Sequence, residues 1–489
     1  MKKIVIIFIL TIIFISCSNE LDLAPISTPS AANFLKSAAD VDVAVNAAYD
    51  ALQQQGLYGE SLNYLFEVRS DNSDESSLGG RGGIVSDIDL FSVRSSNAVL
   101  EATWKDAYLG IQRCNAILNR IEDIDDMDAS TKSIRKGEVQ FIRGLIYFNL
   151  VRVFGDVPLV VTETIDPFDA FGEGRDTAAS VYAQIVTDLT AAASALPASQ
   201  SVVGKTTKGA AYALLGKVEL TLGNYSEAIA ALGNVNGYSL VPNYADIFGE
   251  SNENNQESIF EVQYESGKGS SFSVNGEGTG IGEGSVYSNL FGPFGGGALV
   301  VNGSSNGSNR PTQDLWDSYD PADIRRDVNI GQFGVDNVLY PKKLVAATAG
   351  PLDSGINSIV LRYADVILMH AEALNEQGYV ADGPAFDLIN QIRNRAGLAD
   401  LTSATVTNQA EFRLAIENER RWELAFENHR WPDLVRTGRA VEVMNGHETN
   451  TGGVPVTLNN ISGNQLIYPV PQSEIDTNPA LLPQNPGYN

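Results

Sequence analysis

Apolar residues recur at three- and four-residue intervals over long segments of the chain. This spacing places apolar side chains on one face of a helix, and it predicts helices over residues 30–54, 98–121 and 131–154. Ser30 is expected to cap the first helix, and Gly155 follows the third helix and predicts its end. The pattern therefore predicts a mainly α-helical protein.

Two later segments have the residue spacing of tetratricopeptide-like helical repeats. Residues 361–398 contain small residues followed by a second helical pattern, and residues 205–232 match the repeat more closely. We expect the helices within residues 98–154 to form a third, more degenerate pair. The predicted fold is a helical-repeat scaffold, although an unrelated helical bundle would show the same periodicity. The matching positions within 205–232 are Leu215, Gly216, Gly223, Tyr225 and Ala228.

A glycine-rich insertion at residues 266–310 interrupts the repeats. Thirteen of its 45 residues are glycine, about four times the usual share of about 7 %. A long insertion of this composition is typical of a binding loop or of a disordered one. Tyr287, Phe291 and Phe294 favour a binding loop, because pure linkers rarely contain aromatic residues. Minor β-strands are predicted nearby, where apolar and polar residues alternate at 259–264.

The helical pattern at residues 411–438 combines charged and apolar stripes. Glu419, Glu423 and Glu427 recur at every fourth residue, and apolar residues lie on two sides of the predicted helix. Such a helix is enclosed by protein, so its carboxylates need cationic partners. We expect the arginines of the same segment to supply them, and Pro432 to stop or kink the helix. The predicted structural ion pairs involve Glu419, Glu423, Glu427, Arg430 and Asp433.

The same glutamates raise the question of a hydrolase site. Neighbouring arginines would lower the pKa values of these carboxylates and make them poor general acids, which favours a structural role. His370, His429 and His447 are the only histidines, and they lack the spacing of a metal site or catalytic triad. The acidic run 123–128 lacks EF-hand spacing and is expected to be a solvated turn. We therefore predict no enzymatic activity, no metal site and no cofactor.

Charge narrows the range of partners. Lysine and arginine total 33 residues against 60 aspartates and glutamates, which gives a formal net charge of −27. This balance argues against binding to a nucleic-acid backbone and against an extended basic membrane patch. Nucleic acid is therefore not expected as a partner.

The N-terminus predicts an exported lipoprotein. Two lysines precede the apolar run Ile4–Ile15, which is too short to span a membrane as a helix, and Cys17 follows shortly after. This arrangement resembles a lipobox and implies lipidation of Cys17; the alternative is an ordinary signal peptide with an incidental cysteine. Cys114 lies in a helical pattern and is predicted to be a buried, inert thiol. The expected organisation is a signal peptide at 1–16, a tether at 17–29 and one domain at 30–489.

Several motifs together resemble the SusD/RagB family of surface lipoproteins. They lie in the helix around Trp104, in the turn Phe154–Pro158, in the segment Trp316–Arg326, in the helical pattern 411–438 and in the C-terminal segment 466–489. The resemblance covers the whole chain and implies a SusD-like fold, in which a helical-repeat scaffold carries a loop-rich insertion and minor strands. The matching residues near the C-terminus include Glu419, Arg420, Glu423, Phe426, Glu427, Arg430, Asp433, Arg436, Tyr468, Pro471, Asn478, Pro479 and Gly487.

The resemblance also implies a function. Members of the family are non-enzymatic, lipid-anchored proteins at the surface of the outer membrane. They capture oligosaccharides and pass them to a SusC-like TonB-dependent barrel, and we expect both partners here. A peptide-binding uptake lipoprotein of the same family is one alternative. A secreted glycosidase and a helical-repeat scaffold without a small ligand are the others.

The ligand is expected to contact two loops. All four tryptophans lie in segments that match structural motifs of the family, so the loops at 70–96 and 266–310 must supply the contacts. Each loop aromatic has an alternative role, which is to anchor its loop to the scaffold. The candidate ligand-binding residues are Asp71, Asn72, Arg81, Tyr287, Phe291 and Phe294.

Overall fold

The computed structural model describes residues 34–75, 82–166, 171–270, 282–297, 299–300, 305–451 and 454–488. Its architecture is mainly helical, with short paired strands, which confirms the predicted fold class. The longer helices are α2 (Ala38–Gln53), α5 (Ala98–Arg120), α6 (Ala129–Phe154), α7 (Ala178–Ala195), α8 (Lys208–Thr221), α9 (Tyr225–Leu232), α13 (Tyr363–Gln377), α14 (Pro384–Arg395) and α15 (Gln409–Glu423). The shorter ones are α3 (Ser61–Asn63), α4 (Gly82–Asp89), α10 (Tyr287–Phe291), α11 (Gln313–Ser318), α12 (Arg325–Asn329), α16 (Arg430–Arg436), α17 (Ala440–Met444) and α18 (Gln472–Thr477).

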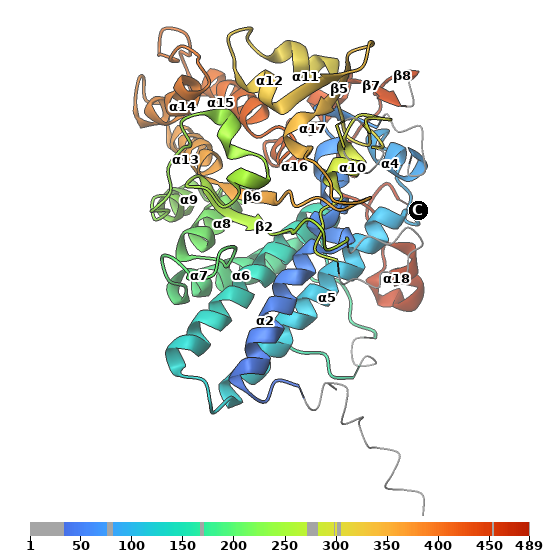
Figure 1. Ribbon diagram of the computed structural model, residues 1–489, viewed down its shortest axis with the longest axis vertical. Coiled ribbons are helices and arrows are strands. Elements are labelled where there is room, and N and C mark those ends of the chain that lie inside the picture. Colours follow the sequence, from blue (N-terminus) through green and yellow to red (C-terminus); the bar gives the residue numbers. More distant parts are fainter. Residues whose placement is uncertain are drawn as a thin grey trace, which may run out of the picture.

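The helices pack against one another largely in chain order. In Figure 1, α2, α5 and α6 run together toward the narrow lower end, and α7, α8, α9 and α13 lie along one side. Helices α11, α12, α14 and α15 lie at the broad upper end. Contacts connect α5 with α6, α6 with α7, α7 with α8, α8 with α9 and α9 with α13. Such stepwise packing is typical of helical repeats.

The ends of the first long helices follow from local capping. Helix α2 begins at Ala38 because the side chain of Ser37 accepts the Asp40 N–H in a capping box. The predicted cap at Ser30 is therefore wrong for α2, and Ser30 itself lies outside the described residues. Helix α6 ends at Gly155, whose φ of +72° favours glycine, as the sequence predicts.

The two predicted helix pairs are present. Helices α8 and α9 approach so closely at Gly216 that an added Cβ would lie 2.6 Å from Leu232 Cδ2. Helices α13 and α14 form the second pair. Sequence periodicity did not identify α7, an alanine-rich helix that packs between α6 and α8. The segment Trp316–Arg326 is not one helix, because α11 ends at Ser318 and α12 begins at Arg325.

The predicted helix over 411–438 is broken near its middle. Helix α15 ends at Glu423, and both Phe426 and Asn428 have a φ of +66° in the connection to α16. The N–H of Phe426 donates to Glu67 Oε1 at 2.9 Å instead of continuing the helix. Pro432 is not the break, because it lies in the first turn of α16, where a missing N–H costs nothing.

The strands form four antiparallel pairs in the described part of the chain. The strand before the glycine-rich insertion, residues 258–262, pairs with a strand after it, residues 358–362. Another pair forms a hairpin between α12 and α13. The predicted strand at 259–264 is present as part of the longest pair. The pairs are β1 (Ser73–Asp74) with β3 (Arg310–Pro311), β2 (Ser258–Val262) with β6 (Ser358–Arg362), β4 (Ile330–Phe333) with β5 (Val338–Pro341), and β7 (Glu448–Thr451) with β8 (Val454–Thr457).

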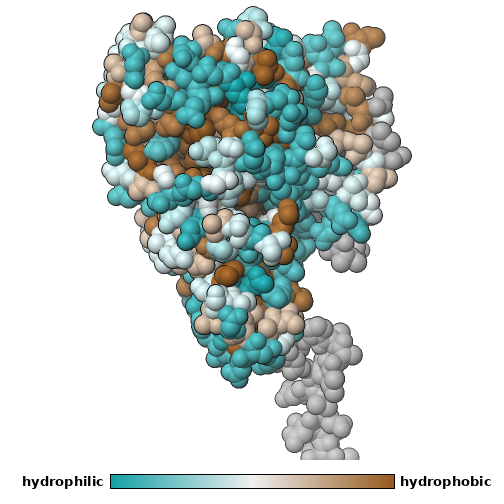
Figure 2. Space-filling model, turned by 60° about the vertical axis from the view of Figure 1, so that its left-hand side comes forward, coloured by the Kyte–Doolittle hydropathy of each residue, from teal (hydrophilic) through white to brown (hydrophobic). Residues whose placement is uncertain are grey.

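One large apolar core runs through most of the molecule, and a smaller one lies among α13, α14 and α15. Cys114 is buried in the large core, where burial raises the pKa of its thiol to about 12. Figure 2 shows the face on the side of α7, α8, α9 and α13, where polar atoms surround apolar ones gathered in the upper part. Among the described residues, no helix is both long and apolar enough to cross a membrane.

Candidate functional site

Two loops that are far apart in the sequence are joined by a short strand pair. Strand β1 pairs with β3 so that Asp74 lies opposite Arg310, and the two side chains form an ion pair at 2.9 Å. Thr312 donates its N–H to Asn72 O and its Oγ1 proton to Asp71 O, both at 2.9 Å. The first loop and the end of the glycine-rich insertion therefore form one continuous surface.

A cleft of about 780 Å³, here called the loop cleft, opens beside this strand pair. Its walls come from β1, β3, the start of α11, the turn between β4 and β5, and the segment between α17 and β7. Clefts of this size accommodate small ligands. The structure thus brings residues from four separate parts of the chain to one candidate binding site, since β3 and the start of α11 are contiguous.

The lining of the loop cleft is acidic and rich in amides. Five carboxylates line it against one arginine, and Gln313, Asn337 and Asn445 add amide groups. Amide groups donate hydrogen bonds to hydroxyl groups and accept them, and ionised carboxylates accept them. The excess of carboxylates repels anions. The described lining contains no phenylalanine, tyrosine or tryptophan. The carboxylates belong to Asp71, Asp74, Asp314, Asp336 and Glu448.

Asp71 is held at the base of the cleft by two arginines. Arg430 binds its carboxylate with both arms of the guanidinium group, at 2.7 and 2.8 Å, and Arg421 lies at 3.1 Å. Burial alone would raise the pKa of Asp71, but the charges of Arg421 and Arg430 outweigh burial and hold that pKa well below its ordinary value. Asp71 is therefore a fixed negative charge that ties the cleft to α15 and α16.

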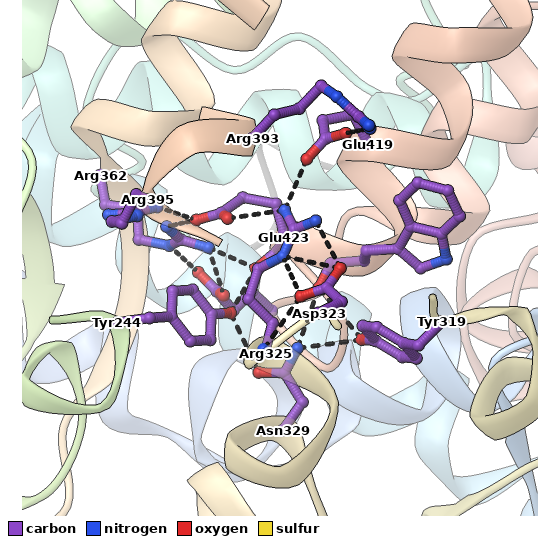
Figure 3. Close-up of polar contacts among 12 residues, drawn as sticks. Tyr244, Tyr319, Asp323, Arg325, Asn329, Arg362, Arg393, Arg395, Glu419 and Glu423 are labelled. Carbon is purple, nitrogen blue, oxygen red and sulfur yellow. Dashed lines mark hydrogen bonds and ion pairs between the residues drawn. The ribbon is translucent and has the colours of Figure 1, made fainter. Parts of the chain in front are cut away.

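A buried ion network holds the C-terminal end of α15 (Figure 3). Arg325 donates to Glu419 at 2.7 Å and to Glu423 at 3.1 Å, and both Arg362 and Arg395 also bind Glu423. All five of these side chains are almost fully buried. Buried carboxylates are tolerated only with such partners, and the network ties the C-terminal end of α15 to α12, β6 and α14.

The cationic partners come from outside the segment 411–438. Arg325 belongs to α12, Arg362 to β6 and Arg395 to α14, whereas the expected partners were arginines of the same segment. Lys343 binds Glu427 at 2.6 Å, and Arg362 binds it at 2.7 Å. Burial would raise the pKa of Glu427, but Arg362 and Lys343 outweigh burial and lower it to about 2. Two of the predicted residues do pair within the segment: Asp433 with Arg420 and Arg436, and Arg430 with Glu417 at 3.5 Å.

Glu67 connects this network region with the loop cleft. Its Oε1 accepts hydrogen bonds from Asn72 Nδ2 at 3.1 Å and from the Phe426 N–H at 2.9 Å. Burial raises the pKa of Glu67 from 4.5 to about 7, in spite of these hydrogen bonds. Glu67 therefore keeps its proton at mildly acidic pH and loses it only as the pH rises through about 7.

Glu67→Gln is expected to stabilise the protein by about 1–3 kcal/mol at pH 8, with little difference near pH 4.5. Between pH 4.5 and 7 the folded state keeps a proton that the unfolded state has lost, so the wild type loses stability as pH rises. Glutamine keeps the acceptor oxygen but carries no charge at any pH. Urea unfolding at both pH values measures the effect, and a difference that does not change with pH would contradict it.

The structure places the predicted ligand-binding residues in different environments. Tyr287 and Phe291 are buried in the core, where Tyr287 Oη donates to Tyr58 O at 2.8 Å. A buried ring offers no face to a sugar, so we correct these two assignments to the alternative role of anchoring the loop. Phe294 is 53 % exposed. Asn72 is buried and supports the cleft from behind, and Asp71 lines it. Arg81 and the lipidation candidate Cys17 lie outside the described residues.

Much of the loop cleft was not predicted from the sequence. Asp336 and Asn337 lie at the tip of the β4–β5 hairpin, whose turn has positive φ at Gly334 and Asn337. Glycine and asparagine between two alternating segments are a turn signal that would have identified this exposed tip. Asn445 and Glu448 carry no comparable signal, because only the fold brings them beside β1.

Two family models match the chain. Residues 327–488 match the model described as the SusD family. Residues 21–220 match the model described as "Starch-binding associating with outer membrane". The matched regions include β1, the first three long helices, and α15 and α16, so both the scaffold and part of the loop cleft lie within them.

Relatives that match over nearly the whole chain are also named SusD-like proteins. SusD-like protein P2 of Formosa agariphila is 26 % identical over the whole of both chains. SusD-like protein P25 of the same organism is 29 % identical over 96 % of this chain and 95 % of its own. A solved structure named "Laminarin binding SusD-like protein" is 29 % identical and has a TM-score of 0.79, over 93 % of this chain and all of that one.

Proposed function

The chain belongs to the SusD/RagB family, and from this premise we propose that it captures neutral oligosaccharides in the loop cleft. In this proposal it is a binding protein without catalytic activity. The observation that carries the proposal is the loop cleft itself, in which two distant loops meet and present carboxylate and amide groups suited to hydroxyls. A relative of the same fold, 29 % identical, is named for laminarin binding, which supports a glucan ligand.

The charge of the cleft narrows the class of oligosaccharide. Asp314, Asp336 and Glu448 are exposed, and Arg310 is the one arginine in the described lining. Uronate or sulfate groups would meet net repulsion there, whereas neutral sugars would not. The same charges would attract a basic peptide, which makes a peptide ligand the second candidate.

The proposal includes delivery to a membrane transporter. The outer-membrane association in the description of the matched family model supports it. We further propose that residues 1–16 are removed, that the lipid on Cys17 anchors the protein at the cell surface, and that residues 30–489 act as one domain. A SusC-like TonB-dependent barrel would then receive the bound glycan.

A secreted glycosidase is the less favoured alternative. The glutamates that suggested a hydrolase site are ion-paired with cationic side chains, and the pKa of Glu427 is lowered to about 2. A general acid needs a raised pKa and contact with substrate, and buried carboxylates in ion pairs have neither.

Native gels that contain laminarin are expected to retard the wild-type protein, whereas gels that contain alginate are not. The double variant Gln313→Ala, Asp336→Ala should weaken retention about tenfold, equivalent to about 1.4 kcal/mol, because it removes an amide and a carboxylate from the cleft. Phe294→Ala tests the remaining aromatic candidate in the same gels.

The matched control is Asp125→Ala, which removes an exposed carboxylate from the turn between α5 and α6. Retention that is equal in the control and the cleft variant would place the glycan elsewhere. Retardation by alginate alone would contradict a neutral ligand. Binding of a basic peptide without any glycan retention would favour the second candidate.

A further inference from the structure

A second cavity lies on the other side of the arginines that hold Asp71. It has a volume of about 560 Å³ and is enclosed by the turn between α8 and α9 together with α13, α15 and α16; we call it the arginine pocket. Arg421 and Arg430 line the arginine pocket, whereas their partners Asp71 and Asp314 line the loop cleft. These ion pairs form the wall between the two cavities.

This wall separates charge. Six arginines and four carboxylates line the arginine pocket, an excess of two positive charges, in a chain whose net charge is −27. His429 adds no charge at neutral pH, because burial lowers its pKa to about 3. Guanidinium groups therefore outnumber carboxylates at the surface of this pocket, although Arg421 and Arg430 are paired across the wall with Asp314 and Asp71, and this lining favours an anionic ligand.

Arg420 is the most buried of the six arginines, with 4 % of its surface exposed. Its Nη1 donates to Asp365 at 2.8 Å and its Nε to Asp433 at 2.7 Å. Its Nη2 is buried and has no hydrogen-bond partner within the described part of the chain. A buried donor without an acceptor is costly, so an acceptor from a ligand or from water that reached this nitrogen would relieve that cost.

The inner end of the pocket adds further positive charge. A small chamber of about 10 Å³ shares residues with the pocket that include Arg420, His429, Asp433 and Arg436, and it is also lined by Arg152 and Lys217. Lys217 binds Asp365 at 2.9 Å, but no described carboxylate lies within ion-pair distance of Arg152. The lining of this chamber therefore has four cationic side chains against one carboxylate, Asp433.

The outer part of the pocket combines apolar and charged side chains, the latter including the exposed Arg413. Leu222 and Leu414 line it and are 40 % and 48 % exposed, which places them toward its mouth. Leu220 and Leu424 line it as well and are buried. Leucines therefore line both the exposed and the buried parts of the pocket, beside the buried guanidinium groups of Arg420 and Arg430. A ligand that matches this lining has an apolar body and an anionic head.

We propose that the arginine pocket binds an amphipathic carboxylate, with its head group beside Arg420 and its apolar body along Leu222 and Leu414. The planar guanidinium group matches a carboxylate in shape and in hydrogen-bond geometry. Either a small organic acid or the C-terminal carboxylate of a peptide supplies this chemistry. The site is separate from the loop cleft, and its occupancy does not depend on the glycan.

Two matched probe pairs test the proposal by calorimetry on the soluble full-length domain. The pairs are decanoate with decanamide, and the peptide acetyl-Leu-Phe with a free or an amidated C-terminus. At least one carboxylate is expected to bind about tenfold more tightly than its uncharged partner. Decanoate alone would identify a small acid as the source, and the peptide acid alone a C-terminus. Equal binding within both pairs, or no binding, would overturn the proposal.

Leu414→Glu is expected to weaken carboxylate binding about tenfold, because it adds a negative charge at the mouth. Leu414→Gln has nearly the same shape without the charge and should change affinity much less. Val380→Glu adds the same charge at an exposed valine outside the pocket lining and serves as the control. Retention in laminarin gels should be unchanged in all three variants. If Leu414→Glu and Leu414→Gln weaken binding equally, charge does not select the ligand.

Discussion

Replacing Arg362 by alanine is expected to lower the free energy of unfolding by about 3–5 kcal/mol, the cost of breaking a buried ion pair by removing one partner. Arg362 is 1 % exposed and binds Glu257 at 2.9 Å and Glu427 at 2.7 Å, in addition to Glu423. Its Nη2 also donates to the backbone O of Glu423 at 2.6 Å. Without Arg362, three buried carboxylates lose a counter-charge.

Urea unfolding followed by circular dichroism measures this loss. Lys136→Ala is the matched control, because Lys136 and Glu122 form an ion pair at 2.7 Å that is exposed, and such pairs contribute about 0–1 kcal/mol. Arg362→Lys should fall between the two variants, since it keeps one charge but loses the bidentate geometry. A cost for Arg362→Ala that is no larger than that of the control would mean that the network does not support α15.

The helical scaffold was predictable because its signals are local. The apolar spacing in α5 and α6 and the glycine that ends α6 depend on residues within a few turns of one another, and the close approach at Gly216 joins two consecutive helices. Helix α7 was missed because alanine gives little contrast between its two faces. Local periodicity therefore reports the helices well only where apolar and polar residues differ clearly.

The break between α15 and α16 was not predictable, because it depends on residues that are far apart in the sequence. The residue that draws the Phe426 N–H away from the helix is Glu67, which is far away in the sequence. The partners of Glu419 and Glu423 likewise come from α12, β6 and α14. The sequence therefore predicted that these carboxylates need cations, whereas only the fold determines which cations they bind.

The candidate site was predicted at the level of loops but not of residues. The two loops do meet, through β1 and β3, yet Tyr287 and Phe291 point into the core. Composition marked them because they stand among glycines, and composition does not report which face of a loop is buried. The hairpin tip at Asp336 lies in a short polar turn, where single residues carry little pattern.

The ion pairs in the wall between the two cavities explain why the lining of one cavity is acidic and that of the other is basic. The guanidinium groups of Arg421 and Arg430 lie on one side, and the carboxylates of Asp71 and Asp314 lie on the other. Each pair is neutral as a whole, but each cavity is lined by only one of its members. The loop cleft is therefore acidic and the arginine pocket basic without any uncompensated charge in the wall.

Replacing Arg430 by alanine is expected to cost about 3–5 kcal/mol of unfolding free energy and also to weaken glycan retention. Both side chains of the Arg430–Asp71 pair are only 6 % exposed, and the variant leaves Asp71 with Arg421 at 3.1 Å as its remaining partner. Asp71 O accepts the Thr312 hydroxyl proton, so a displaced Asp71 would also loosen the junction of β1 and β3.

A second variant separates charge from packing. Arg430→Met combined with Asp71→Asn removes both charges and keeps most of the side-chain volume, so it should unfold at a higher urea concentration than Arg430→Ala. Its retention in laminarin gels should recover in part, since an asparagine can stay buried without a counter-charge. If the double variant is as unstable as the single one, packing and not the stranded carboxylate accounts for the loss. Because Asp71 lies in the wall between the cavities, this comparison also tests whether the wall shapes the loop cleft.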